Sequence, residues 1–567
     1  MLSEAPVLES DIPTSLADSP YIYNLLIPKD NLLRRIREEV DFSFAREMVN
    51  DRYCLNNGRP GIAPEILFRI SFLQYLYNLS DREVIDACHN RLDFKLFLGF
   101  AVEAPAPCDY STLSRARTRW GEDVFKSFFE NTVEQARAKK LLGAKRVVDS
   151  SKTLMNAAVL RASELLNRLC SKLLKAVKTV QTREDEALPH LEAQAVELQG
   201  DRSWFLSDEL KEKRYIRWGE HANELLGYVS FLLNRLETDK VGAVQPRDIE
   251  RVRSLSEILT KHLSDVALEK ELITRAEGKV DRRVKSKARN RATTEPAKPM
   301  PTRKDKLVSD VDPEARQAAD HKRKVKAGYK THVSMDSGSE IVTAVIVTPM
   351  NCDDGPVLPR LIAEESSRGL KVEEVSADSA YADGAVREAL AEHSIAAYIP
   401  EPDPKPSSEG KYISSEFNFH PNTMTLICPG GRISNSATKK GESYLFYFNR
   451  AVCVGCPLKE FCLSQKELDA EVVHGRSVSV SRYRPLHEAA RAGQEGAEHK
   501  DAMNRRLAVE HKQAEMLNER GMRNARFRGL SKTSIQGYLT AAATNIRRMA
   551  VLSLMSEKRN EMRAAAA

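Results

Sequence analysis

The sequence contains no long hydrophobic run and no recognisable export signal. No segment approaches the roughly 18 consecutive apolar residues that a membrane-spanning helix needs. Residues 1–20 are acidic and lack the basic and then apolar layout of a signal peptide. Nine cysteines, an odd number, are few for 567 residues and argue against a disulfide framework. We therefore expect a soluble protein of a reducing compartment, the cytoplasm.

The chain also lacks a strong excess of one charge. It has 87 Lys and Arg residues against 80 Asp and Glu residues, a net charge of +7, so basic residues matter only where they cluster. Hydrophobic residues make up 42% of the chain, which is enough to build a core. At ~150 residues per domain, the length predicts three or four domains.

Residues 30–142 show helical periodicity. Apolar residues recur at helical spacing after Pro64, a residue that the first turn of a helix tolerates. A second helix is predicted from Ser80, with Glu83 completing a capping box. Short helices with a basic last member suggest a helix-turn-helix-like module, although a plain helical packing domain with a solvated basic face fits the same pattern.

The last predicted helix of this region carries three arginines. We expect Ser111 or Thr112 to cap it. At about 100° per residue, Arg115 and Arg119 fall opposite the apolar face, and Arg117 falls near that face. The three arginines are candidates for DNA contacts, with Arg117 reaching the others only by extending its head past the apolar side.

A mixed α/β sheet is predicted from residue 145 onward. Short β-branched runs and helical patterns follow in the order strand, strand, strand, helix, strand, helix, strand. The predicted strands cover 145–149, 328–333, 341–347, 372–378 and 396–399, and the predicted helices cover 356–368 and 383–393. Long amphipathic helices between about 160 and 300 interrupt the sheet after its first strand, and their apolar stripes predict a hairpin or coiled coil.

Two of the predicted strands end in an acid, Asp149 and Asp378. Strands of one sheet can bring their ends together, and a hard divalent cation would relieve the repulsion between the two carboxylates. Glu510, on a later helix, is the best candidate for a third acid, with Glu515 as the alternative. Many strands end in Asp by chance, so each acid taken singly also fits a residue without a catalytic function.

Four cysteines crowd into one short segment, with the spacing of a zinc knuckle in its centre. They are Cys428, Cys453, Cys456 and Cys462. Four thiolates would close a tetrahedral shell, so the predicted role of zinc is structural, in a segment too poor in apolar residues to fold unaided. A reduced, metal-free cluster is the alternative.

Basic residues cluster in three segments, 279–306, 321–330 and 505–532. Such runs are usually solvated faces, but one that surrounds a carboxylate site is better explained by a phosphate backbone. The candidates for DNA contacts in the last two segments are Lys322, Arg323, Lys324, Arg505, Arg506 and Lys512. Trp204 and Trp218 could stack on an unpaired base, although packing in a core is the commoner use of tryptophan.

Three motifs in this order resemble the acidic triad of bacterial insertion-sequence DDE transposases. They are Val147-Val148-Asp149-Ser150-Ser151, Ala377-Asp378-Ser379-Ala380-Tyr381 and Arg506-x-x-x-Glu510. The segments Pro64 to Leu98, Asp109 to Arg115, Gly328-Tyr329-Lys330 and Thr348-Pro349-Met350-Asn351 resemble the same family. The type with a cysteine-bearing insertion before the glutamate, the eleven-eighty-two type, is the most similar one.

The resemblance implies a ribonuclease-H-like catalytic core that holds two Mg²⁺ or Mn²⁺ ions at Asp149, Asp378 and Glu510. It also implies double-stranded DNA as substrate, both transposon ends and target, and a homodimer that holds two ends together. Related transposases have a tyrosine and a lysine at the outer positions of the glutamate helix, where this chain has Met503 and Leu517. Lys512 or Arg505 could substitute for them.

The expected organisation is a multidomain α/β protein whose core is interrupted twice. The predicted parts are an N-terminal helical DNA-binding or dimerisation domain (1–144), the first core strand (145–160), a helical insertion with a basic linker (161–308), the continued core (309–400), a cysteine-rich insertion (401–500), C-terminal core helices (501–552) and a tail (553–567).

The predicted function is that of a DNA transposase that binds the ends of its insertion sequence, cleaves the strand and transfers it. Two alternatives remain open at this point. One is a DNA-binding protein with a decayed active site, against which the presence of all three acids speaks. The other is a ribonuclease-H-like nuclease without strand transfer.

Overall fold

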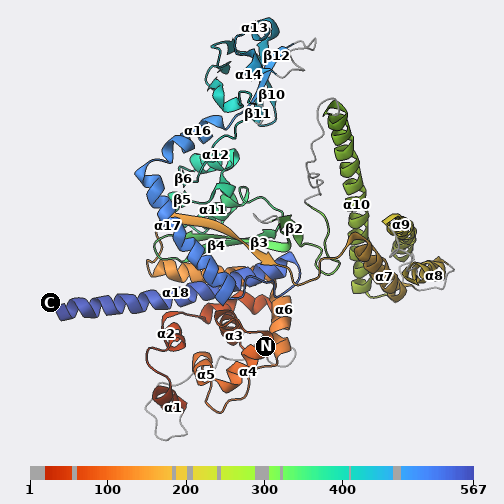
Figure 1. Ribbon diagram of the computed structural model, residues 1–567. Helices are drawn as coiled ribbons and strands as arrows, with labels where there is room; N and C mark the ends of the chain where they lie inside the picture. The colour runs from red at the N-terminus through yellow and green to blue at the C-terminus, as the bar shows by residue number, and fades with distance from the viewer. Residues whose placement is uncertain are drawn as a thin grey trace.

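The computed structural model describes residues 19–53, 61–181, 187–200, 208–238, 244–287, 305–319, 324–407, 410–463 and 474–566. A central sheet has N-terminal helices on one side, a bundle of long helices beside it and a small β-rich module beyond its other end (Figure 1). In the described part of the chain, no helix is long and apolar enough to cross a membrane.

The N-terminal region is helical, as predicted. It contains α1 (Ser19–Leu26), α2 (Leu32–Glu39), α3 (Pro64–Leu76), α4 (Asp81–Asn90), α5 (Leu92–Leu98) and α6 (Tyr110–Ala138). Pro64 occupies the first turn of α3, and Ser80 and Glu83 form the predicted capping box of α4. The prediction for the start of α6 was wrong, because the cap is Asp109, whose carboxylate accepts the Ser111 N–H at 2.8 Å.

Aromatic side chains form the centre of this region. The Phe68 ring stacks on Trp120, at 4.7 Å between centroids, and on Phe128, at 4.5 Å. Trp120 and Phe128 both belong to α6, which continues through a non-helical Gly121 with φ of +80°. The positive φ suits glycine, and the resulting kink lets both halves of the helix face Phe68.

The sheet is mixed, and its strands follow the predicted order except for β2, which was not predicted. Its strands are β1 (Lys145–Leu154), β2 (Arg316–Ala319), β3 (Val325–Asp336), β4 (Val342–Pro349), β5 (Glu374–Ser376) and β6 (Ala396–Tyr398), with α11 (Val357–Ser367) and α12 (Gly384–Glu392) in the predicted helical positions. β3 pairs antiparallel with β1, β2 and β4. On its other side β1 pairs parallel with β5, and β5 pairs parallel with β6.

Alternate residues of β1 pack on opposite faces of the sheet. Val147 joins a core with Ile535 and Ile546 of α18 (Leu530–Ala566), whereas Val148 joins a core with Leu358 and Leu361 of α11. The N-terminal helices also pack against α18. The sheet is therefore covered by α18 and the N-terminal region on one face and by α11 and α12 on the other (Figure 1).

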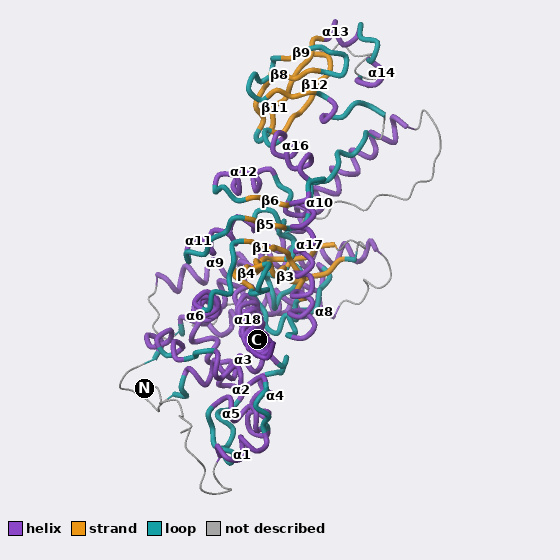
Figure 2. Tube along the Cα trace, turned by 90° about the vertical axis from the view of Figure 1, so that its left-hand side faces the viewer, coloured by secondary structure: helices purple, strands orange, loops and turns teal. Residues whose placement is uncertain are grey.

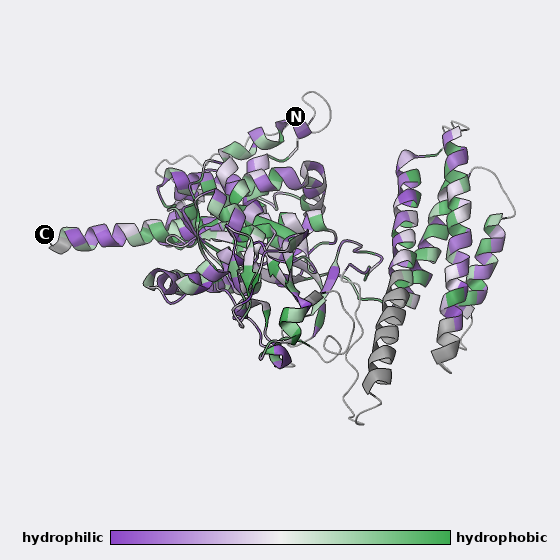
Figure 3. Cartoon of the chain, turned by 90° about the horizontal axis from the view of Figure 1, so that it is seen from above, coloured by the Kyte–Doolittle hydropathy of each residue, from purple (hydrophilic) through white to green (hydrophobic). Residues whose placement is uncertain are grey.

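A bundle of long helices lies between β1 and β2 in the chain. It consists of α7 (Ala162–Val180), α8 (Ala187–Gly200), α9 (Asp208–Thr238) and α10 (Pro246–Lys287). The predicted apolar stripes are its core, which includes Leu169, Leu232 and Leu259. Figure 3 shows this bundle set apart from the body of the protein, opposite the projecting C-terminal end of α18.

Residues 410–463 and 474–481 form a small module that contains two three-stranded sheets. One sheet has β7 (Asn418–His420), β8 (Thr425–Ile427) and β9 (Ile433–Ser434), and the other has β10 (Ala437–Lys440), β11 (Ser443–Asn449) and β12 (His474–Ser481). Two short helices, α13 (Arg450–Val454) and α14 (Lys459–Cys462), carry two of the four clustered cysteines, Cys453 and Cys462, and Cys456 lies between them. The strands lie at one end of the molecule in Figure 2, and the sequence analysis predicted none of them.

The chain returns to the sheet through α16 (Arg484–Gly493) and α17 (Ala497–Ala514). A π-helical turn, η6 (Glu515–Glu519), follows α17. α17 packs against β1, β5 and β6 and therefore crosses the strands that carry or precede the two predicted aspartates.

Candidate active site

The two strand-terminal aspartates lie on neighbouring parallel strands. Asp149 is part of β1, and Asp378 comes two residues after the end of β5. Val147 pairs with Ser376 in the parallel register of these strands. Two residues further along each strand are Asp149 and Asp378, so the register brings the two acids together at one end of the sheet.

Asp149 is held in a position that disfavours its charge. Its side chain is 15% exposed, and the Ser150 N–H donates to its Oδ1 at 2.8 Å. Burial raises the pKa of Asp149 from 3.8 to about 6, and the negative charges of Asp378 and Glu510 add to this rise. The Ser150 N–H and the Arg506 guanidinium oppose it without cancelling it.

Asp378 forms the start of a tight turn. Its carboxylate accepts the Ala380 N–H at 3.0 Å and so caps the 3₁₀ turn η4 (Ser379–Tyr381). Burial raises the pKa of Asp378, while the Ala380 N–H and the positive charge of Arg506 act in the opposite direction. Both aspartates thus lie where a positive charge would be stabilising.

Glu510 reaches this pair from α17. Arg506 lies one turn before it and donates from Nη2 to the Glu510 Oε1 at 2.8 Å. The other terminal nitrogen of Arg506, Nη1, is 3.9 Å from the Asp149 Oδ2. Arg506 therefore links Glu510, whose side chain is 47% exposed, to the aspartate on β1.

Glu515, the alternative third acid, has a different environment. Its carboxylate lies 2.9 Å from Lys512 Nζ, 2.8 Å from Arg520 Nη2 and 3.4 Å from Arg547 Nη1. Burial raises its pKa, but Lys512 and Arg520 outweigh burial and lower the pKa below the ordinary value. Glu515 is a structural anchor of the turn after α17, and Glu510 is the acid that faces Asp149.

The donor chemistry of the three acids fits a hard divalent cation, because carboxylate oxygens are the ligands that Mg²⁺ and Mn²⁺ prefer. In the conformation described, however, Arg506 lies between Glu510 and Asp149. Across the described ranges, no group of three or more His, Cys, Asp or Glu side chains stands ready to hold a metal ion. A cation at this site would have to replace the contact that Arg506 makes with Glu510.

Comparison with known families adds two matches at the two ends of the chain. Residues 22–119 match a family model described as "Transposase domain (DUF772)", and residues 427–550 match one described as "Transposase DDE domain". Together they fit an insertion-sequence DDE transposase. Searches of curated proteins and of solved structures find no match. The second matched segment contains Glu510, whereas Asp149 and Asp378 lie between the two segments.

A transposase domain implies a DNA substrate, and the predicted DNA contacts differ in how available they are. Arg115 and Arg119 are exposed on α6, near Tyr53, whose ring lies 4.9 Å from the Arg119 guanidinium. Arg117 is 9% exposed, pairs with Asp81 and lies over the Phe527 ring. The prediction that Arg117 contacts DNA is corrected: its guanidinium is buried in an internal contact.

The predicted contacts on α17 are also engaged within the protein. Arg505 pairs with Glu374 and Asp501, and Lys512, 6% exposed, pairs with Glu515 and Glu340. The suggestion that Lys512 substitutes for a missing DNA contact is therefore corrected as well.

Three further basic candidates lie in or next to a segment that the structure does not describe. Lys322 and Arg323, like residues 288–304 of the basic connector, lie outside the described residues. Lys324 is exposed just before β3.

The four clustered cysteines lie close enough to influence one another's charge, and two of them receive backbone hydrogen bonds. The Arg432 N–H donates to Cys428 Sγ at 3.3 Å, and the Leu458 N–H donates to Cys456 Sγ at 3.4 Å. Two glycines leave room for the sulfurs, because a Cβ built at Gly475 would lie 2.7 Å from Cys453 Sγ and one at Gly430 3.3 Å from Cys456 Sγ. In the part of the chain that the structure describes, however, the four sulfurs do not form a group ready to hold a metal ion, so zinc stays a prediction for this segment.

The cysteine module also has a core of its own. Buried residues from both sheets form it: Phe417, Phe419, Leu426, Phe446, Phe448, Val478 and Val480. The segment therefore has an apolar core that the sequence analysis did not predict. Burial raises the pKa of Cys453 and, to about 11, that of Cys462, so these thiols are protonated at neutral pH unless a metal displaces the proton.

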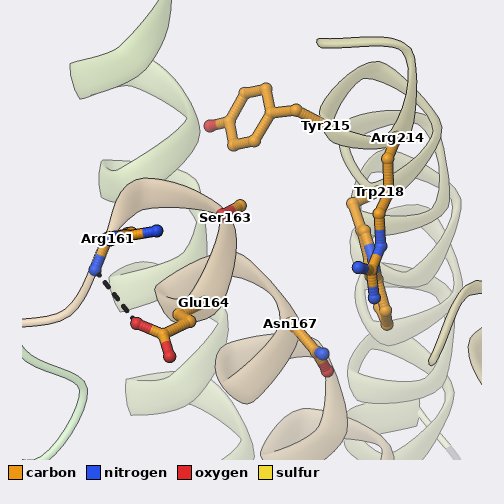
Figure 4. Close-up of a pocket in the computed structure, with 7 residues that line it drawn as sticks. All are labelled: Arg161, Ser163, Glu164, Asn167, Arg214, Tyr215 and Trp218. Carbon is orange, nitrogen blue, oxygen red and sulfur yellow. Dashed lines mark hydrogen bonds between the residues drawn. The ribbon is translucent and has the colours of Figure 1, made fainter. Parts of the chain in front are cut away.

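Trp218 lines a pocket in the helical bundle, far along the chain from the carboxylates. The pocket also contains Arg161 and Asn167 of the start of α7, with Arg214 and Tyr215 of α9 (Figure 4). Trp218 is 1% exposed and belongs to the bundle core, which favours the packing role. Trp204 lies outside the described residues.

The sequence analysis missed a group of polar residues near Asp378. Lys330 and His332 of β3 share one face of that strand, and Asp354 lies 2.7 Å from Lys330 Nζ and 3.8 Å from His332 Nδ1. Tyr381, at the end of η4, lies 3.3 Å from His332 Nδ1 through its phenol oxygen. Polar residues at alternate positions of a buried strand were the available signal.

Proposed function

We propose that the protein is a DNA transposase that binds the ends of its insertion sequence and cleaves and transfers DNA strands with Asp149, Asp378 and Glu510. The observation that carries the proposal is the parallel register of β1 and β5, which brings the two aspartates together beneath the helix that bears Glu510. The family matches at both ends of the chain support the same function.

The strand arrangement supports a ribonuclease-H-like core. Three antiparallel strands, β4, β3 and β1, continue into two parallel strands, β5 and β6, with helices on both faces. The helical bundle after β1 and the cysteine module after β6 are then insertions into this core. Such insertions extend loops without disturbing the pairing of the strands.

The geometry supports a proposed role for each of four side chains. Asp149 and Asp378 are held by backbone N–H groups, so their free oxygens are fixed for ligation. Arg506 is placed to exchange its contact with Glu510 for a DNA phosphate, which would release Glu510 toward Asp149. Two divalent cations bound by the three acids would supply activation of a water for nicking and of a 3′-hydroxyl for strand transfer.

DNA recognition is assigned to the exposed arginines of the N-terminal region. Arg115 and Arg119 project from one face of α6, as side chains of a groove-entering helix would. Their joint replacement by alanine should weaken binding to the element's ends about tenfold, with a smaller effect on random DNA. Equal losses on both DNAs in a binding titration would show that this helix reads no sequence.

A homodimer that holds two ends is part of the proposal, and light scattering of the DNA complex tests it.

A structural zinc ion is proposed for Cys428, Cys453, Cys456 and Cys462, on the basis of the N–H donors and the glycine cradle around the sulfurs. Metal analysis of protein purified without chelator should find about one zinc per chain, the content that a closed four-thiolate shell implies. Cys456→Ser should lose the metal, and Cys352→Ser, at a free thiol of the sheet domain, should retain it. Zinc-free wild-type protein of full stability would contradict the assignment.

A nicking assay on DNA that carries the element's own ends tests the function. Asp149→Ala, Asp378→Ala and Glu510→Ala should each lower nicking by about a thousandfold, the equivalent of several kcal/mol of lost metal catalysis, and leave DNA binding intact. Glu373→Ala, at an exposed acid before β5, is the matched control.

The alternatives make different predictions. Binding without cleavage by the wild-type protein would indicate a decayed enzyme. Nicking without joining of the 3′-end to target DNA would indicate a nuclease. Full activity in all three alanine variants would refute the active site.

A further inference from the structure

Tyr381 is a buried side chain that the proposed chemistry does not use. It is fully buried and belongs to the core between the sheet and helices α11 and α12. A phenol in such a place usually has a polar partner, because an unpaired hydroxyl is costly to bury. Its partners identify what the residue does.

Tyr381 is connected to Asp378 through the turn η4. The carboxylate of Asp378 caps η4, and Tyr381 is the last residue of that turn, with its N–H donating to the Asp378 carbonyl at 3.1 Å. The position of the Tyr381 side chain therefore sets the position of the turn on which Asp378 lies.

Tyr381 is also connected to Asp149, through Ser150. The residue after it, Ser150, donates its N–H to the Asp149 carboxylate, and the Ser150 side chain lies beside the Tyr381 phenol. Ser150 pairs with His332 across the β1–β3 ladder, so both side chains point to the face of the sheet on which Tyr381 packs.

His332 anchors the phenol from β3. Its Nδ1 lies 3.3 Å from the Tyr381 hydroxyl and its Nε2 lies 3.0 Å from the Thr348 hydroxyl on β4. The imidazole is fully buried, and burial lowers the pKa of His332 to about 4, so a neutral ring serves as donor at one nitrogen and acceptor at the other.

We propose that Tyr381 is a positioning residue: its phenol, held by His332, fixes the turn of Asp378 against the strand of Asp149 and so sets the spacing of the two carboxylates for a divalent cation. The inference rests on the proposed function. Tyr381 touches neither cation nor DNA in this role. It acts through the backbone segments that carry the two acids.

Tyr381→Phe removes the hydroxyl and keeps the ring. We expect Mn²⁺ to bind the full-length variant about tenfold to a hundredfold more weakly in a calorimetric titration without DNA, as when outer partners of metal ligands are removed. Nicking should require correspondingly more Mn²⁺ and recover at saturating Mn²⁺, with unchanged affinity for DNA. Tyr398 is on the neighbouring strand β6 and bonds through its phenol to Glu498 of α17, and Tyr398→Phe should leave Mn²⁺ affinity unchanged.

His332→Gln provides a second test and covers the case in which Tyr381→Phe does not fold. It should weaken Mn²⁺ binding to a similar degree, and the double variant should be no weaker than Tyr381→Phe alone, because both changes remove one contact. A lowered melting temperature with wild-type Mn²⁺ affinity in the folded variants would overturn the proposal. If Asp149→Ala also binds Mn²⁺ normally, the proposed metal site itself fails, whereas loss in Asp149→Ala alone refutes only the role of Tyr381.

Discussion

Two groups of carboxylates lie along β1, and the fold neutralises one far more completely than the other. Asp336 and Glu365 share the Arg146 guanidinium, with contacts of 3.1 Å to Nη1 and 2.5 Å to Nε, and all three side chains are at most 3% exposed. Asp149, three residues after Arg146 on β1, lies near Asp378, and among the described residues its one ion pair is with Arg506, 3.9 Å away.

The difference teaches how to separate structural from functional acids in one sheet. The first group has a cation, backbone N–H donors and, for Glu365, the Thr343 hydroxyl at 2.8 Å. The second group keeps a raised pKa, which means that its charges are not compensated from within the protein. A bound cation would stabilise a group of this kind.

The largest expected effect on stability comes from breaking the compensated group. Arg146→Met would leave two buried carboxylates without their cation and should cost about 3–5 kcal/mol of unfolding free energy. Chemical denaturation measures this cost. A loss below about 1 kcal/mol would show that Arg146 does not compensate the pair.

Removing a charge from the uncompensated group, Asp149 and Asp378, should raise the stability of the metal-free protein instead of lowering it. The pKa of Asp149 is raised from 3.8 to about 6, so its ionisation destabilises the metal-free fold by about 3 kcal/mol above pH 6, and the penalty disappears as pH falls below about 4. Asp149→Asn should therefore stabilise the metal-free protein by about that amount at pH 7.5 and have no effect near pH 4. Denaturation curves of both proteins at the two pH values check the sign, and a destabilised variant at pH 7.5 would contradict it.

A smaller difference in stability is expected between variants of two glutamates, Glu510 in α17 and Glu515 in the turn that follows it. Glu515→Gln should cost about 1–3 kcal/mol, because it leaves Lys512 and Arg520 without their buried partner. Glu510→Gln should change stability by less than about 1 kcal/mol, because the Glu510 side chain is 47% exposed to water. Thermal melts of the two variants compare them directly, and equal losses would remove the structural distinction.

Much of the sheet could be predicted from sequence, because its order depends on local patterns. The runs that became β1, β3, β4 and β5 contain β-branched residues, and Asp149 in β1 and Asp378 after β5 are visible without any structure. The strands of the cysteine module were not predicted, since most of them span two to four residues and show too few alternations to detect.

The contacts within the site depend on residues far apart in the chain and could not be predicted. Arg506 was a candidate for a DNA contact, and only the packing of α17 on β1 brings it between Asp149 and Glu510. The burial of Arg117 depends on Asp81 and on Phe527, which lies more than 400 residues away in sequence. Periodicity could place Arg117 near an apolar face but could not identify its partners.

The most direct test of the account is the effect of Mn²⁺ on the stability of wild-type protein and of Asp149→Asn at pH 7.5. The account predicts that Asp149→Asn is the more stable protein without metal, and that Mn²⁺ at ten times its dissociation constant stabilises only the wild type, by about 1.4 kcal/mol. Equal stabilisation of both proteins by Mn²⁺, or none of the wild type, would contradict the claim that the uncompensated acids of β1 and β5 are kept for a cation.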